Sequence, residues 1–240
     1  MRNAMTQDEL NEALLEAATS RHIKRIGALI KKGAQIDAAD DMGRRPLHWA
    51  AWHADKEMAE LLLASGAQIC AVNNDGKQPL HEAVWRGHGE MAGFLIGKGA
   101  QICAADKEGR QPLHVAVRMG DKEMVALLIA KDAPVDAVGW NGERPLHVAA
   151  RQGYGGKEVV KLLLGHGADP VDLNDEGKTP RECCMDCKEN EEVRRLLEVD
   201  RKILARVKLE WDESRIHEAL AAIRARQRQF GSLRRKGPTI

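Results

Sequence analysis

The chain has 240 residues, a formal net charge of +1 and 30% charged residues. It begins without the apolar core of a secretory signal, and no run of about 18 apolar residues, the length that spans a bilayer, occurs in it. These features exclude a transmembrane protein and lead us to expect a cytoplasmic protein, with a nuclear location left open.

Residues 1–38 predict two helices, over 8–18 and 22–32. The spacing of 16 residues from Ala17 to Gly33 returns from Ala50 to Gly66, so these residues form a first copy of a repeated unit. Its outward face is polar, as a unit at the end of a stacked array must be for solubility. The polar residues on this face are Glu9, Glu12, Glu16, Lys24 and Lys31.

Residues 39–172 contain the phrase Pro-Leu-His, which returns every 33 residues. Its prolines are Pro46, Pro79, Pro112 and Pro145, and a further proline, Pro180, follows after 35 residues. A fixed period of this size indicates an array in which each repeat is one supersecondary unit that buries its apolar face on its neighbours. The period predicts four full units, over 39–71, 72–104, 105–137 and 138–172.

Each full unit predicts a turn followed by two helices. A glycine such as Gly43 supplies a positive φ in the turn, and the proline then starts the first helix, where its missing N–H is no loss. Apolar residues at helical spacing, for example Met58 and Leu62, mark the second helix. A left-handed glycine cap ends that helix in most units. The cap glycines are Gly33, Gly66, Gly99 and Gly167.

The junction between the fourth and fifth units departs from this pattern. Asp132 stands where the other units have the cap glycine, and a left-handed backbone costs more at aspartate than at glycine. The fifth unit also carries two inserted residues around Tyr154, Gly155 and Gly156. We therefore expect this junction to be the loosest within the array.

Residues 173–200 predict a divergent C-terminal capping unit, because Thr179 and Pro180 are not followed by Leu-His. Residues 201–240 lie outside the repeat. They contain eleven Lys and Arg against four Asp and Glu, so this tail is basic while the first 200 residues are mildly acidic. Apolar residues at helical spacing predict a basic helical extension here. These residues are Leu204, Val207, Trp211, Ile216, Leu220 and Ile223.

The repeated pattern Gly-x-x-Pro-Leu-His-x-Ala-Ala/Val, followed by a Leu-Leu pair and Gly-Ala, resembles the ankyrin repeat over residues 8–200. The resemblance implies an all-α solenoid of six helix–turn–helix units with β-turn tips, capped at both ends. The family usually has a threonine before the proline, and here only Thr179 keeps it. The hydrogen bond of that hydroxyl near the histidine is therefore in question in four units, whose residues are Arg45, Gln78, Gln111 and Arg144.

In proteins that resemble this one, the end of each first helix and the turn tips form a concave surface that meets partners. Tryptophan and arginine are the residue types most enriched at binding hot spots, and both occur here at these positions. The alternative is that the indoles pack on neighbouring repeats while the arginines are solvated. The candidate partner-binding residues are Met42, Arg44, Trp52, His53, Lys77, Trp85, Arg86, Arg110, Arg118, Met119, Trp140 and Arg151.

The repeated histidines form a predicted ladder along the stack. Rungs about 10 Å apart cannot share a zinc ion, whose ligand nitrogens lie about 2 Å from the metal, so structural hydrogen bonds are expected of them. The four rungs are His48, His81, His114 and His147.

Five cysteines occur in the chain. Cys70 and Cys103 occupy equivalent repeat positions about 8–10 Å apart, beyond the roughly 7 Å that a disulfide allows between Cα atoms, so they are expected to stay reduced. The Cys-x-x-Cys formed by Cys184 and Cys187, next to Cys183, lacks the second pair of a zinc site. Packing in the cap is therefore favoured, with bound zinc as the alternative, and we expect no cofactor.

The sequence shows no phosphate-binding loop, nucleophile elbow or His-Glu-x-x-His motif, so we expect no enzyme activity. The expected function is that of a non-catalytic scaffold or adaptor. It would bind another protein, one with an acidic patch, through the concave groove, and it would act as a monomer away from membranes. The alternative is a regulatory or structural subunit whose basic tail docks on nucleic acid or another acidic surface. Steep salt dependence of binding would favour that alternative.

Overall fold

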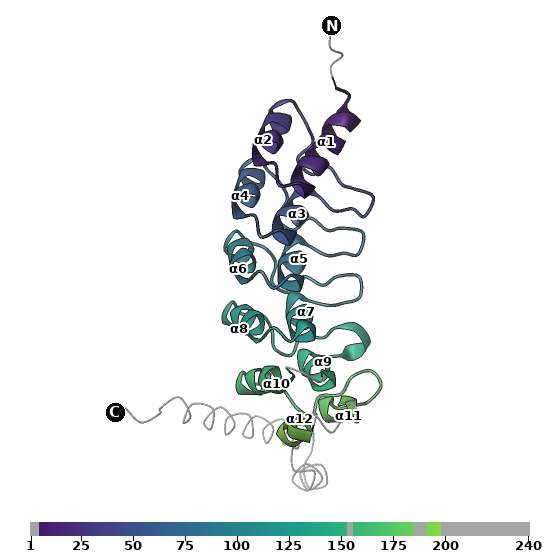
Figure 1. Cartoon of the computed structure of the whole chain (residues 1–240). Helices are drawn as coiled ribbons and strands as arrows, with labels where there is room; N and C mark the ends of the chain where they lie inside the picture. The colour runs from purple at the N-terminus through teal and green to yellow at the C-terminus, as the bar shows by residue number, and fades with distance from the viewer. Residues whose placement is uncertain (1–4, 153–155, 185–190, 198–240) are drawn as a thin grey trace, which may run out of the picture. The chain divides into compact units, whose positions relative to one another are not determined.

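The computed structural model describes residues 5–152, 156–184 and 191–197, in which α-helices and one short 3-10 helix are connected by turns (Figure 1). The chain forms two compact units. The N-terminal unit contains Met1–Ala116 and Leu127–Ala133, and the C-terminal unit contains Val117–Ala126 and Pro134–Ile240. Helices α7 (Pro112–Met119) and α8 (Lys122–Ala130) contribute residues to both. The all-α repeat fold predicted from the sequence is confirmed.

The helices of the N-terminal unit form two columns (Figure 1). The first column contains α1 (Gln7–Thr19), α3 (Pro46–Trp52) and α5 (Pro79–Trp85). The second contains α2 (Ile23–Lys31), α4 (Lys56–Ala64) and α6 (Gly89–Gly97). Each first helix packs on its own second helix, and α3 packs on both α1 and α5. The core between them is aliphatic, and its fully buried residues include Leu14, Ile26, Leu47, Met58, Leu62, Leu80 and Leu95.

The turn tips of the N-terminal unit, residues 40–44, 73–77 and 106–110, share one hydrogen-bond pattern. The carboxylate of Asp40 accepts hydrogen bonds from the backbone N–H groups of Met42 at 2.9 Å and Arg44 at 2.8 Å. The φ of Gly43 is +72°, and a Cβ there would lie 2.7 Å from the backbone nitrogen of Asn74. Glycine is therefore required both by the conformation and by the close approach of the next tip.

The histidines join one repeat to the next. In the N-terminal unit, His48 Nδ1 accepts a hydrogen bond from the Arg45 backbone N–H at 3.1 Å, and His48 Nε2 donates to the Lys77 carbonyl at 3.0 Å. His81 makes the equivalent bond to the Arg110 carbonyl at 3.2 Å. The structural role expected of the ladder is thus confirmed for these histidines. A backbone N–H supplies the local hydrogen bond that the missing threonine had put in question.

Burial keeps these imidazoles neutral. Desolvation lowers the pKa of His48 to about 4, against the hydrogen bond to the Lys77 carbonyl, which acts in the opposite direction. Burial likewise lowers the pKa of His81, and it lowers the pKa of His147 in the C-terminal unit. A neutral ring with its proton on Nε2 is the form that can accept at Nδ1 and donate at Nε2.

Besides its share of α7 and α8, the described part of the C-terminal unit contains the 3-10 helix η1 (Trp140–Gly142) and helices α9 to α12. Helix α9 (Pro145–Arg151) packs on α10 (Gly156–Gly165) and α11 (Pro180–Cys183), and α10 packs on α12 (Glu191–Leu196). His147 Nε2 donates to the Lys178 carbonyl at 3.1 Å, which extends the same repeat-to-repeat bond into this unit. The predicted extension over 201–240 and most of the inserted segment around Tyr154 lie outside the described residues.

The left-handed caps occur where the sequence predicts them. The cap glycines have φ between +93° and +96°, and Asp132 has φ +67° in their place. Cys70 and Cys103 are free thiols, as expected, and Cys183 is also free. In the described part of the chain no helix is long and apolar enough to cross a membrane.

Candidate functional site

An aromatic cluster lies at the end of α3 in the N-terminal unit. The rings of Trp49 and Trp52 meet edge to face, with centroids 6.5 Å apart and planes at 70°. Trp49 also stacks on His53, with centroids 6.0 Å apart and planes at 22°. Two arginines cover these indoles, Arg44 at 4.1 Å and Arg86 at 4.6 Å from the ring centroids of Trp49 and Trp52. We call these five residues the Trp49 cluster.

Helical geometry assembles the cluster from three neighbouring segments. Residues three and four apart on a helix share a face, so Trp52 and His53 lie beside Trp49. Arg44 belongs to the tip that precedes α3, and Arg86 follows the end of α5 in the next repeat. Each guanidinium over an indole contributes about 0.5–1 kcal/mol at an exposed site. The cluster therefore links consecutive repeats while leaving one edge on the surface.

Two polar atoms of the cluster have no partner. Trp49 Nε1 and His53 Nε2 are covered and make no hydrogen bond within the described structure. Burial, the largest influence, lowers the pKa of His53. These two nitrogens therefore contribute no hydrogen bond to the stack, whose rings are in direct contact. Neither atom is open to a ligand unless the stack moves.

The sequence prediction for the tryptophans requires that their rings are not sealed between the stacked repeats. Trp85 is 39% exposed, and Trp52 is half-buried beneath Arg86. Met42, at the tip beside Arg44, is 55% exposed. These side chains remain accessible on the N-terminal unit. Sequence reasoning missed Trp49, although an indole three residues before Trp52 on one short helix was the available signal.

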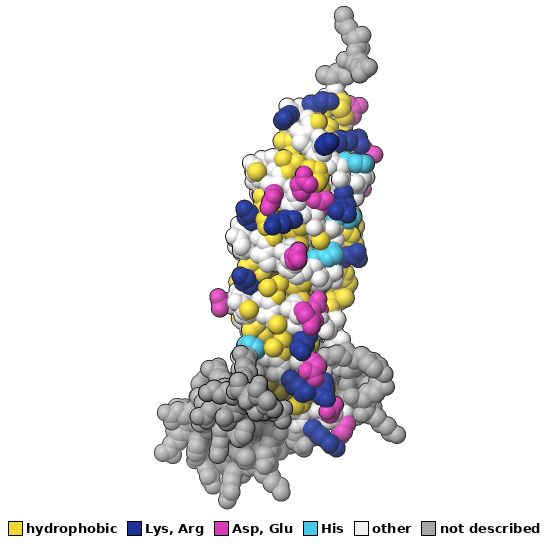
Figure 2. Space-filling view, turned by 60° about the vertical axis from the view of Figure 1, so that its left-hand side comes forward, with side chains coloured by type: hydrophobic (Ala, Val, Ile, Leu, Met, Phe, Trp, Pro, Cys, Tyr) yellow, Lys and Arg dark blue, Asp and Glu magenta, His cyan; other side chains and the backbone are white. Residues whose placement is uncertain are grey.

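Most of the predicted cations are already neutralised by carboxylates of their own tips. Arg44 pairs with Asp40 at 2.9 Å and Lys77 with Asp75 at 3.2 Å. Arg110 forms ion pairs with both acidic residues of its tip, Asp106 and Glu108. On the face that Figure 2 draws, positive and negative side chains are intermixed with hydrophobic surface and form no patch of one sign.

Arg86 differs from the other predicted cations of the N-terminal unit. It is exposed, its guanidinium lies over Trp52, and no described carboxylate pairs with it. A guanidinium presents five N–H donors in a rigid fork, and stacking on a ring leaves the donors at its edge accessible. Arg86 is therefore the predicted arginine best placed to receive a carboxylate from outside the unit.

The remaining predicted residues belong to the C-terminal unit. Met119 is 47% and Trp140 is 65% exposed. Arg151 forms an ion pair with Glu143, and the exposed Arg118 accepts a hydrogen bond at its carbonyl from Gln152 Nε2 at 2.6 Å. Among the described residues of this unit no cation lies over the Trp140 ring, in contrast to the stacked indoles described above.

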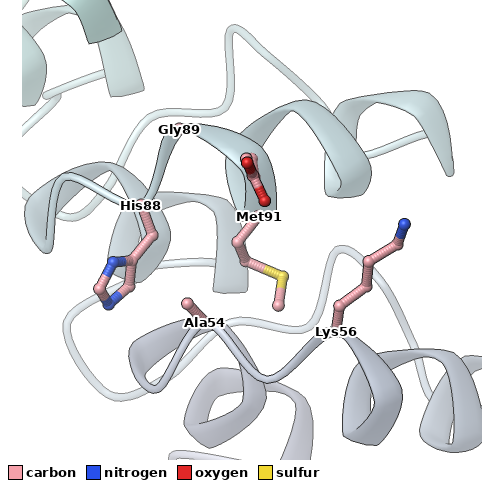
Figure 3. Close-up of a pocket in the computed structure, with 6 residues that line it drawn as sticks. Ala54, Lys56, His88, Gly89 and Met91 are labelled. Carbon is pink, nitrogen blue, oxygen red and sulfur yellow. The ribbon is translucent and has the colours of Figure 1, made fainter.

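A small pocket lies between the start of α4 and the start of α6 (Figure 3). In Figure 3 the Met91 side chain reaches toward Ala54, with His88 on one side and Lys56 on the other. His88 Nε2 donates to the Trp52 carbonyl at 3.0 Å, which fixes the imidazole at the pocket edge. The volume is about 240 Å³. Sites for cofactors and drug-sized ligands are larger, about 300–1,000 Å³.

Among the described residues, no three side chains of His, Cys, Asp or Glu come together as a metal site would require. Cys187 lies outside the described residues. Burial raises the pKa of the neighbouring Cys183 thiol. A raised thiol pKa keeps the sulfur protonated at neutral pH, and a protonated thiol is a poor metal ligand and nucleophile.

Glu82 is a second residue that sequence reasoning missed. It lies on α5, one residue beyond the ladder histidine His81, and is 7% exposed. Within the described structure its carboxylate forms no ion pair and accepts no hydrogen bond. Burial raises the pKa of this carboxyl, against the nearby charges of Lys77 and Arg44, which lower it.

Comparisons with known proteins agree with this arrangement. A family model described as ankyrin repeats (many copies) matches residues 14–63 and 53–96, and one described as ankyrin repeats (3 copies) matches residues 102–174. The comparison with curated proteins finds no match. The matched segments contain the four Pro-Leu-His turns and the left-handed caps at Gly33, Gly66 and Gly167. The chain belongs to the ankyrin repeat family.

Proposed function

We propose that the chain is a non-catalytic scaffold or adaptor that binds a protein partner at the surface formed by the Trp49 cluster and Trp85. Ankyrin repeats are in general protein–protein interaction modules. The observation that carries the proposal is the 39% exposure of Trp85, one residue before the stacked Arg86, on a unit whose other large apolar residues are mostly buried. Exposed indole area of this kind marks interaction sites.

The proposed mechanism is rigid complementarity. Cation–π and ring contacts hold Trp49, Trp52 and Arg86 in place before any partner arrives, so little side-chain entropy is lost on association. Trp52 and Trp85 act as apolar anchors. Arg86 sets the orientation by receiving a carboxylate of the partner.

Two finer expectations belong to this proposal. The chain acts as a monomer in the cytoplasm, and the free thiols of Cys70, Cys103 and Cys183 are consistent with a reducing compartment. The second candidate function, docking by the basic tail, depends on residues 201–240, which are outside the described structure. No structural observation favours it over binding at the cluster.

Capture of partners from native lysate tests the proposal, with the full chain compared with Trp85→Ala. We expect the anchor substitution to weaken binding of the captured partner by about 2 kcal/mol. The matched control is Leu173→Ala, which removes another exposed apolar side chain, 55% accessible, from the C-terminal unit. If the control weakens binding as much as Trp85→Ala, or if neither does, the proposed surface is wrong.

A further inference from the structure

Glu82 carries a charge that the fold buries without compensating it. Its side chain is 7% exposed, and no described lysine or arginine reaches it as an ion pair. Its oxygens are nevertheless absent from the fully covered atoms that lack a partner, so the carboxylate keeps an opening to the surface. A desolvated, unpaired carboxylate destabilises a folded chain.

The repeat itself shows that a carboxylate is unnecessary for the fold at this position. The residue that follows the ladder histidine is Trp49, Glu82, Val115 and Val148 in the four full repeats. Apolar side chains therefore fit the same site in three neighbouring repeats, and valine there leaves no charge to desolvate. A residue that costs stability where a neutral one fits is best explained by a role in binding.

The cations near Glu82 contact other groups. Arg86 is four residues after Glu82 and directly follows the end of α5, and this is the spacing at which a glutamate and an arginine can pair on a helix. Its guanidinium lies over Trp52 instead, 4.6 Å from the ring centroid. Lys77 and Arg44, whose charges reach Glu82 without pairing to it, are bound to Asp75 and Asp40. The carboxylate thus remains open to a cation from outside.

We infer that Glu82 is a specificity-determining residue of the binding surface and receives a lysine or arginine side chain of the protein partner. The inference rests on the proposed function and assigns a basic anchor to the partner, next to the carboxylate that Arg86 receives. The partner's cation would be flanked by the aromatic Trp49 cluster of the preceding repeat. Such a charge-assisted hydrogen bond is both shorter and stronger than a neutral one.

A displayed library of random peptides, selected on the full chain, supplies the probe. We expect the selected peptides to contain a lysine or arginine whose replacement by alanine weakens binding about tenfold or more on the original chain. On Glu82→Gln, which keeps the shape and removes the charge, the same replacement should change binding by less than about twofold. Glu90→Gln removes an exposed carboxylate from α6 and should behave like the original chain.

The outcomes separate the two proposals. Peptides that lose binding on Trp85→Ala but bind Glu82→Gln unchanged, or that have no basic anchor, would overturn the role of Glu82 and leave the surface in place. Selected peptides that all bind Trp85→Ala unchanged would overturn the surface itself, and the role of Glu82 with it.

A second measurement needs no ligand. Because the fold raises the pKa of Glu82, the ionised carboxylate disfavours the folded state at neutral pH. Glu82→Gln should therefore raise the melting temperature at pH 7, and the gain should shrink as acid protonates Glu82 in the original chain. A lower melting temperature would show that the carboxylate supports the fold, which contradicts the inference.

Discussion

The two compact units are built from the same type of repeat, but their exposed tryptophans have different surroundings. In the N-terminal unit, Trp52 is half-buried because Arg86 of the following repeat lies over its ring. In the C-terminal unit, Trp140 lies in a 3-10 turn and is 65% exposed. Its neighbour Asn141 has φ +56°, in the left-handed region. The comparison shows that a cation stacked on the ring, and not the indole itself, decides whether an aromatic side chain is held in place.

The largest expected effect concerns what the two units have in common, the aliphatic core. Leu62 is completely buried, so Leu62→Ala should lower the free energy of unfolding by about 2–5 kcal/mol. Urea unfolding of the full chain measures this loss. Leu63→Ala, at a half-buried position of the same helix, is the matched control and should lower the free energy of unfolding clearly less. Equal losses at the two positions would mean that the second helices are not packed by the face described here.

Acid should weaken the fold through the histidine ladder, which occurs in both units. The folded-state pKa of His48 is about 4, below the ordinary 6.5, so unfolding takes up a proton between these values. The stability present above pH 6.5 is therefore lost as pH falls toward 4, by an amount on the order of 3 kcal/mol for this histidine.

Urea unfolding at pH 7 and pH 4.5 tests this prediction, with His48→Gln as the comparison. The variant is expected to be less stable at pH 7 but to lose less stability between the two pH values. An unchanged pH dependence would show that another group takes up the proton.

The cap at Asp132 should respond more modestly. Its φ of +67° is in the left-handed region, where glycine has no steric penalty, so Asp132→Gly should raise the free energy of unfolding by about 1 kcal/mol. Gly99→Ala at the equivalent cap of α6, where φ is +96°, should lower the free energy of unfolding. Hydrogen exchange is expected to be faster in α8 than in α6. Equal protection would contradict the predicted loose junction.

The smallest expected effect would sharpen the comparison between the tryptophans. Arg86→Gln removes the guanidinium over Trp52 and should cost about 0.5–1 kcal/mol of stability. Quenching of tryptophan fluorescence by a neutral solute should rise as the ring becomes accessible. Arg118→Gln, another exposed arginine after a first-helix core, serves as the control. Unchanged quenching in Arg86→Gln would mean that the arginine does not shield the indole.

The architecture was predictable because the period repeats the same local physics. Proline at N1, glycine at the caps and neutral histidine each favour one local backbone conformation or hydrogen-bond pattern. Helices α1 and α2 accordingly begin and end within two residues of the predicted positions. The state of the charges was not predictable. Arg44 and Lys77 form ion pairs with Asp40 and Asp75 of their own tips. These pairs depend on side-chain rotamers and on the tip geometry, which the spacing of residues in the sequence does not specify.

The candidate surface was predictable only in outline. Trp52, Trp85 and Arg86 were identified from their position after the first-helix core, and the structure leaves them accessible in different degrees. Trp49 and Glu82 were missed because their repeat position holds valine in two other repeats, which suggests core. Only the stacking of neighbouring repeats shows that this position meets the surface as well.

The hydrogen bond from each ladder histidine to the carbonyl of the following tip also has a consequence for the length of the array. A repeat with this histidine is incomplete until a successor supplies the acceptor. In the last described repeat the same position is Glu182, whose carboxylate accepts from the backbone N–H of its own Thr179 at 2.9 Å. A carboxylate can take the place of the accepting Nδ1, but it has no N–H to donate to the carbonyl of a further tip. One substitution therefore removes the repeat-to-repeat hydrogen bond and marks where the addition of modules can stop.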